Sequence, residues 1–239
     1  DVNWIDPSGT ASEWVVKWKP VSSSIWEMAT AYTTTYSISP LTPNTAYNVT
    51  VATVCGSDTS IYTSTNFTTP CAAVTTIPYS ESFDIYGTAA GAFPSCWFRP
   101  VLNTTTPYPS IVTANALSSP GNLRFQSASA ALPTYAITPQ LDVNINTLKV
   151  SFNLKAESIT SSGTMQVGVM SDPNNLATFE VVETITPAST SYTNYEVMLT
   201  NTTLTGTGNY VAFKHVTASA SYYYWLDDVI INYAPSCVR

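Results

Sequence analysis

Short segments in which apolar and polar residues alternate, each ended by a turn signal, recur along the whole chain. Residues 147–154 and 165–170 alternate in this way, and the runs at 119–122 (Ser-Pro-Gly-Asn) and 172–175 (Asp-Pro-Asn-Asn) are typical of turns. Alternation with a period of two indicates a half-buried β-strand, and Pro, Gly, Asn and Asp favour the turns between strands. No helical periodicity persists beyond a turn or two. The sequence therefore predicts an all-β fold.

Charged residues are scarce, at 10% of the chain, and the net charge is −7. Because a nucleic-acid-binding protein needs a basic face to displace counterions from phosphates, we expect no nucleic-acid partner. The acidity also argues against docking on an anionic membrane. No apolar run reaches the roughly 18 residues that a spanning helix requires, so we expect no direct membrane insertion. The chain opens at Asp1 without a signal-peptide pattern, which we interpret as cropping of a longer protein.

A turn motif in the first 70 residues leads directly into a strand. Leu41 and Tyr47 begin and end a Leu-x-Pro-x-Thr-x-Tyr run, and the residues at 48–54 alternate after it. This run resembles the tyrosine corner of fibronectin type III domains, in which the Tyr hydroxyl bonds to upstream backbone and fixes the turn between two sheets. The resemblance implies an immunoglobulin-like sandwich over residues 1–70, with structural roles for Leu41 and Tyr47.

The same resemblance places the other strands of this module. It implies that Trp4 lies in the core on the second strand, that residues 14–19 form the third strand, and that residues 66–70 form the last. A first strand would then precede Asp1. We therefore expect the module to be truncated at its N-terminus.

Residues 77–233 carry five separated blocks in a fixed order. The blocks are 80–84 (Ser-Glu-Ser-Phe-Asp), 93–97 (Phe-Pro-Ser-Cys-Trp), 135–142 (Tyr-Ala-Ile-Thr-Pro-Gln-Leu-Asp), 210–215 (Tyr-Val-Ala-Phe-Lys-His) and 226–229 (Leu-Asp-Asp-Val). This order resembles the cleaved-adhesin domains of gingipain-type haemagglutinins and the related MAM-like jelly rolls. The resemblance implies a larger antiparallel β jelly roll over 77–233. A linker at 71–76 would precede it, and residues 234–239 would begin a following linker.

Four cysteines in an acidic, Thr-rich chain favour an oxidising compartment, and none forms a Cys-x-x-Cys pair. In a fibronectin-like module Cys55 follows the sixth strand and Cys71 the seventh. The two should lie at opposite ends of the sandwich, too far apart for a bridge. Cys71 lies at the junction with the jelly roll and Cys96 lies near the start of that domain, so we predict a Cys71–Cys96 disulfide. Cys237 would pair with a following module and Cys55 with a residue before Asp1, and four free, buried cysteines are the alternative.

Catalysis has little support in the sequence. His215 is the single histidine, and because no nucleophile motif lies near it we interpret it as structural. The acidic residues show no paired signature of a glycosidase; the candidates are Asp84, Glu157, Glu180, Glu183, Asp227 and Asp228. A catalytic jelly roll is therefore a weaker alternative than a non-catalytic chain.

A better use of these acidic residues is to bind calcium, which takes several oxygen ligands from carboxylates, amides and carbonyls. Asp84 ends the first block of the jelly roll, Asp227 and Asp228 lie in the last, and first and last strands are often neighbours in this fold. Successive strand residues point to opposite faces, so we expect only one inner ligand. Asp227 is in phase with Trp225 and Val229, which favours an inward direction.

The adhesin resemblance implies structural calcium in this region, with Asp84 and Asp227 at its acidic positions. Asn122, on a turn, is a candidate amide ligand, and Asp228 is a further candidate. The alternative is that these side chains only bond backbone amides at strand ends.

Aromatic residues offer a second kind of binding surface. Residues 222–225 (Tyr-Tyr-Tyr-Trp) are dense, and Tyr108 stands between two prolines. Exposed rings stack on sugars, whereas strand alternation would place every second ring in the core. Asn-x-Thr sequons, which matter only in a eukaryotic secretory setting, begin at Asn48, Asn66, Asn103 and Asn201.

The sequence is interpreted as a non-catalytic adhesion or ligand-binding region of a secreted or surface-anchored bacterial multidomain protein. Its partner would be a host or cell-surface protein or a glycan, recognised by loops and sheet faces on a rigid scaffold. The alternative is a carbohydrate-binding accessory region of a polysaccharide-degrading enzyme.

Overall fold

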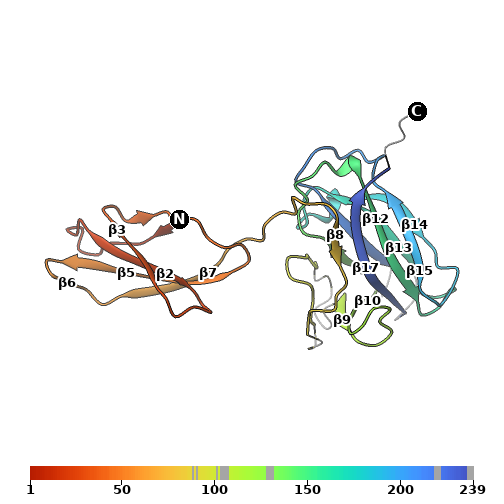
Figure 1. Ribbon diagram of the computed structural model, residues 1–239, viewed down its shortest axis with the longest axis horizontal. Helices are drawn as coiled ribbons and strands as arrows, with labels where there is room; N and C mark the ends of the chain where they lie inside the picture. The colour runs from red at the N-terminus through yellow and green to blue at the C-terminus, as the bar shows by residue number, and fades with distance from the viewer. Residues whose placement is uncertain are drawn as a thin grey trace. The chain divides into compact units, whose positions relative to one another are not determined.

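The computed structural model describes residues 1–87, 89, 91–100, 102, 108–127, 132–217 and 222–235. Within them the regular structure is β-strand apart from two short 3₁₀ turns, which confirms the all-β prediction. The chain divides into two compact units, Asp1–Ala72 and Ala73–Arg239 (Figure 1). No helix in the described ranges is long and apolar enough to cross a membrane.

The first unit is a sandwich of two antiparallel sheets. In the larger sheet β2 lies between β3 and β5, and β7 and β6 pair with β5; in the smaller sheet β1 pairs with β4. Residues of both sheets, among them Val16, Val49 and Tyr36, meet in one core. The strands are β1 (Val2–Asn3), β2 (Trp14–Pro20), β3 (Glu27–Ala31), β4 (Thr35–Tyr36), β5 (Ala46–Cys55), β6 (Asp58–Thr59) and β7 (Thr63–Thr68).

Tyr47 fixes the turn that enters β5. Its hydroxyl accepts a hydrogen bond from the backbone N–H of Thr42 at 3.0 Å, and its buried ring stacks on Phe67 at 5.7 Å. Leu41 and Trp4 are partly buried against the same core. This is the contact pattern that the fibronectin resemblance implies.

We expect the Tyr47→Phe substitution to destabilise the first unit by about 1 kcal/mol, because the Thr42 N–H loses its partner while the ring packing is kept. Urea unfolding of the full chain, with resonances of β5 followed by NMR, measures this loss. The matched control is Tyr32→Phe, at a ring that is 72% exposed. Equal midpoints for the two variants would show that the corner bond contributes nothing.

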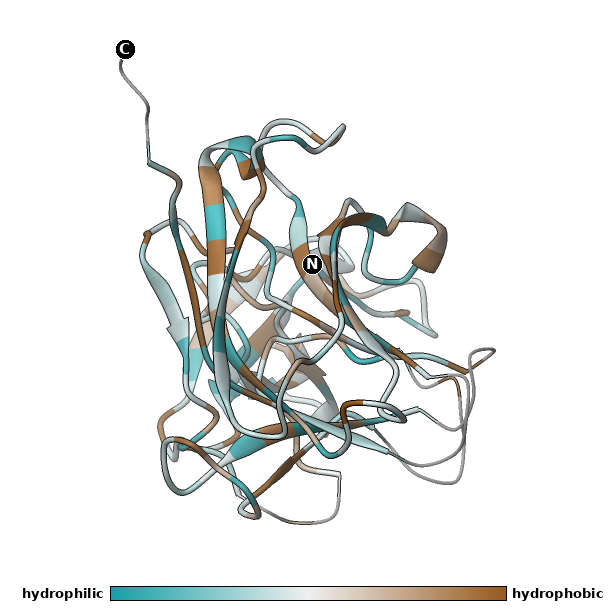
Figure 2. Ribbon diagram, turned by 90° about the vertical axis from the view of Figure 1, so that its right-hand side faces the viewer, coloured by the Kyte–Doolittle hydropathy of each residue, from teal (hydrophilic) through white to brown (hydrophobic). Residues whose placement is uncertain are grey.

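The second unit is also built from two antiparallel sheets, and alternate residues along its strands differ in hydropathy (Figure 2). The larger sheet has the order β15-β12-β17-β10-β9, with β8 also paired to β17; the smaller has the order β11-β16-β13-β14. The larger sheet comprises β8 (Tyr79–Glu81), β9 (Ser110–Val112), β10 (Asn122–Gln126), β12 (Leu148–Ala156), β15 (Thr193–Met198) and β17 (Tyr223–Tyr233). The smaller comprises β11 (Thr134–Ile137), β13 (Thr164–Met170), β14 (Glu180–Ile185) and β16 (Tyr210–Val216), and the 3₁₀ turns are η1 (Ile145–Thr147) and η2 (Leu176–Thr178).

The core of this unit lies between the two sheets. Along β12 every second residue is buried, as period-two alternation requires. Phe152 of the larger sheet meets Phe213 of the smaller edge to face, with 5.1 Å between ring centroids. The outer face of the larger sheet is thereby left to Ser151, Asn153 and Lys155, and the candidate site lies on this face.

The expected linker at 71–76 is only partly a linker. The backbone of Val74 forms a parallel bridge with Leu141, and its N–H donates to the carbonyl of Gln140 at 2.7 Å. Val74 therefore belongs to the second unit, and the two units divide between Ala72 and Ala73 rather than across a six-residue spacer. The sequence does not show this bridge, because the segment has too little apolar character to be told apart from a true linker.

Cys71 and Cys96 are both disulfide-bonded, and Cys55 is free and exposed. Cys237 lies outside the described residues, as does the sequon residue Asn103. The pairing of Cys71 with Cys96 stays a prediction. Peptide mapping under non-reducing conditions should recover a Cys71–Cys96 peptide, and a Cys55–Cys71 peptide would contradict it.

Candidate functional site

Three carboxylates converge on the hydroxyl of Ser118. The distances from Ser118 Oγ are 3.4 Å to Asp84 Oδ2, 3.3 Å to Asp227 Oδ1 and 2.9 Å to Asp228 Oδ1. Asp84 follows β8, Ser118 lies between β9 and β10, and the two other aspartates belong to β17. Because β8 pairs with β17, the expected adjacency of the first and last strands is confirmed. We call these four residues the acidic cluster.

Both aspartates of β17 reach the cluster because the strand is irregular there. Asn153 pairs with Asp227 and Ser151 with Ile230, so β17 has one extra residue between these pairs, and Asp228 has a φ of 49°. A β-bulge of this kind breaks the alternation of side chains. The strict alternation on which the expectation of a single inner ligand rested therefore does not hold here, and the ligand roles stay a prediction.

The direction expected for Asp227 was wrong. Leu226 and Val229 belong to the core between the sheets, and Asp227 lies on the opposite face beside Trp225. It is fully buried, because the segment at 117–118 covers it and donates two backbone N–H groups to its Oδ2, at 2.8 and 3.2 Å. The bulge shifts the phase between Asp227 and Val229, which a strict alternation cannot predict.

The three carboxylates of the cluster share few hydrogen-bond donors and have no cationic partner among the described ion pairs. The Ser118 hydroxyl has one proton and can donate to one of the three carboxylates at a time. In the described part of the chain the one ion pair joins Lys149 to Glu196, away from the cluster. Burial raises the pKa of Asp227 to about 6, and the neighbouring charge of Asp228 contributes to the rise. A cation would relieve this repulsion.

Without divalent cations, the contribution of Asp227 to the stability of the second unit should fall as the pH rises from 4 to 7. The folded state binds the Asp227 proton more strongly than the unfolded state, whose ordinary pKa is 3.8. The stabilisation is therefore complete below that pH and is lost as the pH rises through about 6. Urea unfolding in chelator at several pH values, of the natural chain and of Asp227→Asn, measures this contribution as the difference between the two chains. The buried His215, whose pKa is lowered to about 4, acts in the opposite direction in both chains and cancels in that difference. The natural chain should lose stability relative to the variant as the pH rises, and a difference that stays constant would contradict the assignment.

Two further oxygen atoms near the carboxylates have no hydrogen-bond partner. The Asn122 side chain donates to the carbonyl of Ala114 at 2.9 Å, but its Oδ1 is buried and unpaired. The Tyr192 hydroxyl is also buried and unpaired. Burial raises its pKa, and the charges of Asp227 and Asp228 raise it further, which places the phenol within their field. Unpaired buried oxygens beside carboxylates are what a hard cation would use.

The cluster as it stands is wider than a calcium shell, whose oxygens lie about 2.3–2.6 Å from the ion. Across the described ranges, no group of three or more His, Cys, Asp and Glu side chains is close enough to hold a metal ion. Ser118 occupies the middle of the cluster, so an ion must either take its hydroxyl as a ligand or displace it. The donor types fit calcium, and occupancy stays a prediction.

A groove of about 480 Å³ lies beside the cluster on the outer face of the larger sheet. Asp228 belongs to both, because its Oδ1 faces Ser118 and its Oδ2 accepts from the amide of Asn153 at 3.3 Å. Serine and asparagine side chains line it together with two carboxylates and apolar side chains, among them two exposed isoleucines. The lining residues are Ser80, Glu81, Ser82, Ile85, Ser151, Asn153, Asn194, Asp228, Val229 and Ile230.

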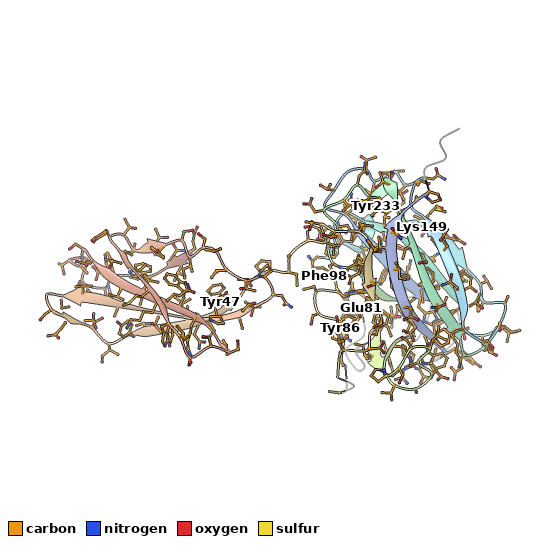
Figure 3. All side chains as sticks on the ribbon, viewed as in Figure 1. Tyr47, Glu81, Tyr86, Phe98, Lys149 and Tyr233 are labelled. Carbon is orange, nitrogen blue, oxygen red and sulfur yellow. The ribbon has the colours of Figure 1, made fainter. Side chains whose placement is uncertain are left out.

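Glu81 holds the segment that carries Asp84. Its carboxylate accepts from the backbone N–H of Phe83 and from the Tyr86 hydroxyl, both at 2.7 Å, and Glu81 and Tyr86 are labelled together in Figure 3. Burial raises the pKa of Glu81. Its partners all belong to the local turn, so we assign Glu81 a positioning role that sequence reasoning missed.

His215 is a structural residue of the smaller sheet. It is fully buried, with its Nδ1 3.1 Å from the hydroxyl of Ser127 and its Nε2 2.6 Å from the carbonyl of Ser162. Burial lowers its pKa to about 4. A catalytic dyad needs an accessible nucleophile and a base with a carboxylate partner, and this arrangement offers neither.

The remaining candidates from the sequence do not gather into a site. Trp225 is only 6% exposed and Tyr224 is fully buried, whereas Tyr222 and Tyr223 are half-buried, which agrees better with the structural role of residues 222–225 than with a glycan platform. The Tyr108 hydroxyl accepts from Arg124 at 2.8 Å. Glu157 and Glu180 accept backbone N–H groups of Tyr223 and Thr203, and neither belongs to the acidic cluster.

Comparison with known proteins agrees with the two-unit fold. The fibronectin type III domain family matches residues 1–68. No protein of curated function matches the sequence of this chain.

Solved structures resemble mainly the second unit. The K1 cleaved adhesin domain of Lys-gingipain from Porphyromonas gingivalis W83 has 20% identity and a TM-score of 0.50, covering 67% of this chain and all of that domain. The K2 cleaved adhesin domain of Lys-gingipain has 16% identity and a TM-score of 0.50, covering 66% of this chain and 99% of that domain. Because the first unit is less than a third of the chain, this coverage falls mostly on the second. At such identities the likeness shows the fold of the jelly roll alone.

Proposed function

We propose that the chain is a non-catalytic ligand-binding region of a secreted or surface-anchored bacterial multidomain protein that acts in adhesion. The observation that carries this proposal is the groove beside the acidic cluster, on the outer face of the larger sheet. The single histidine of the chain, His215, is buried in the smaller sheet, which supports a role without turnover. The partner would be a host or cell-surface protein or a glycan.

In this proposal calcium is a structural ion of the acidic cluster. Asp84, Asp227 and Asp228 supply the charge, and the unpaired oxygen of Asn122 supplies a neutral donor. Because Asp228 also borders the groove, the ion would fix one wall of the binding surface.

A carbohydrate-binding accessory role is the second candidate. It is favoured by the lining of the groove, where Ser and Asn side chains offer donors and acceptors to hydroxyl groups of a sugar. An adhesin and an accessory region differ in what they bind, cells or polymeric polysaccharide.

Binding of the labelled chain to intact cells and to insoluble polysaccharides tests the proposal. Ile230→Lys, which places a charged chain in the groove, should weaken binding at least about tenfold, equivalent to 1.4 kcal/mol. Ile159→Lys is the matched control, because Ile159 is 51% exposed and outside the groove. If the two variants bind equally well, the groove is not the binding site. Treating the cells with glycosidases or with protease identifies the class of partner.

A further inference from the structure

The outer face of the larger sheet in the first unit carries an aromatic and cationic surface. Lys17 and Lys19 lie two apart on β2, so both side chains leave the same face of the sheet. The ammonium of Lys17 lies 4.4 Å from the ring centroid of Tyr62, and that of Lys19 lies 5.2 Å from the ring of Trp26. We call Lys17, Lys19, Trp26, Met28 and Tyr62 the lysine–aromatic face.

This face has apolar side chains that the fold does not use. Met28 is 64% exposed and Trp26 40% exposed, although both belong to residue types that cores favour. Lys17, Trp26, Met28, Thr50 and Tyr62 together line a shallow depression of about 370 Å³. Depressions of this size accommodate a small ligand.

The charge of the face is unpaired. The first unit contains no arginine and no histidine, so Lys17 and Lys19 are its only cationic side chains, against five Asp and Glu residues. Neither lysine forms an ion pair anywhere in the described residues. Lys19 instead donates to the carbonyl of Ser23 at 2.7 Å, and a hydrogen bond from Lys17 lowers the pKa of the Tyr62 hydroxyl. An acidic unit thus concentrates its positive charge on one aromatic surface.

The position of the face on the sheet limits what can bind there. β2 is paired on both sides, with β3 and β5, so its backbone groups are already used. A peptide that adds a strand requires an open sheet edge, and an acidic motif bound in a bidentate manner requires arginine. Partly exposed aromatic rings beside lysine ammonium groups suit a ligand with a rigid ring that carries one negative charge.

We propose that the lysine–aromatic face binds a sugar that carries a carboxylate, with the ring stacked on Trp26 or Tyr62 and the carboxylate on the lysines. This names a second site and a ligand class within the binding role proposed above, and it rests on that role. The site lies wholly in the first unit, so it does not involve the acidic cluster.

Titration of the full chain with trigalacturonate tests this proposal, and the fully methyl-esterified trisaccharide is the probe that lacks only the charge. We expect the ester to bind at least about tenfold more weakly, a difference of about 1.4 kcal/mol. The affinity for trigalacturonate should fall with added salt, and the indole N–H resonance of Trp26 should shift on binding. Chelator should leave the affinity unchanged, which separates this site from the acidic cluster.

Variants locate the site. Lys17→Gln and Trp26→Ala should each weaken trigalacturonate binding about tenfold or more. The control is Lys214→Gln in the second unit, where the ammonium also lies near two rings but Tyr135 is buried. The proposal would be overturned by equal binding of the acid and the ester, or by no binding of either. It would also be overturned by tighter binding of a hexaglutamate peptide, or by a loss of binding in the Lys214→Gln variant alone.

Discussion

Calcium should reverse the effect of the Asp227→Asn substitution on the stability of the second unit. At pH 7 in chelator the variant should be as stable as the natural chain or more stable, because it removes one of three crowded negative charges and keeps an oxygen that accepts from Leu117 and Ser118. At a calcium concentration 100 times Kd the natural chain should gain about 2.7 kcal/mol. The variant should gain much less, so the natural chain becomes the more stable.

Urea unfolding in chelator and in calcium measures the four free energies of unfolding that this comparison needs. Asp142→Asn is the control, since Asp142 is exposed and belongs to no part of the cluster. If calcium stabilises the Asp227 variant as much as the natural chain, the ion is bound elsewhere. If calcium stabilises neither, the cluster is closed by hydrogen bonds alone.

Replacing Phe213 with alanine should destabilise the second unit by about 3–5 kcal/mol. Phe213 is fully buried in β16 and joins the two sheets, since its ring meets Phe152 at 5.1 Å and stacks on Trp97 at 6.4 Å. The loss is measured from the unfolding transition of the second unit in the full chain. The control is Ile159→Ala, at an exposed position, which should change the free energy of unfolding by no more than about 0.5 kcal/mol. If Phe213→Ala lowers the free energy of unfolding by a similarly small amount, the contacts of Phe213 are not part of the core between the two sheets.

The fold was predictable because its signals are local. The alternation along β12 and β13 reflects one buried face, and the turns between strands carry their own residue types. The Leu41–Tyr47 run likewise places a tyrosine where its hydroxyl reaches Thr42. The short backbone bridge at Val74 has no such signal, because it depends on the distant partner Leu141.

The acidic cluster was predictable in its members and not in its geometry. Asp84, Asp227 and Asp228 were identified by residue type and by the pairing of first and last strands. The bulge at Asp228 brings both aspartates of β17 together, but no residue type in the sequence indicates that a bulge is there. Ser118 and Tyr192 were missed because a hydroxyl on a loop and a phenol before β15 become relevant only through contacts distant in sequence.

The lysine–aromatic face shows a signal that the sequence does contain. Lys17 and Lys19 alternate with the buried residues Val16 and Trp18, so their outward direction follows from the period of the strand. Their pairing with Trp26 and Tyr62 could not be read in advance, because Tyr62 belongs to the segment before β7 and reaches Lys17 across the sheet.

The most direct test of the non-catalytic binding role is to recover the ligand after it has been bound. The glycan retained best by the chain would be incubated with it for a day in calcium, eluted, and measured by mass spectrometry. We expect saturable binding and a recovered ligand of unchanged mass. Shortened or otherwise altered products, lost on substitution of Asp84, Asp227 or Asp228, would show that the chain is an enzyme and contradict the non-catalytic role.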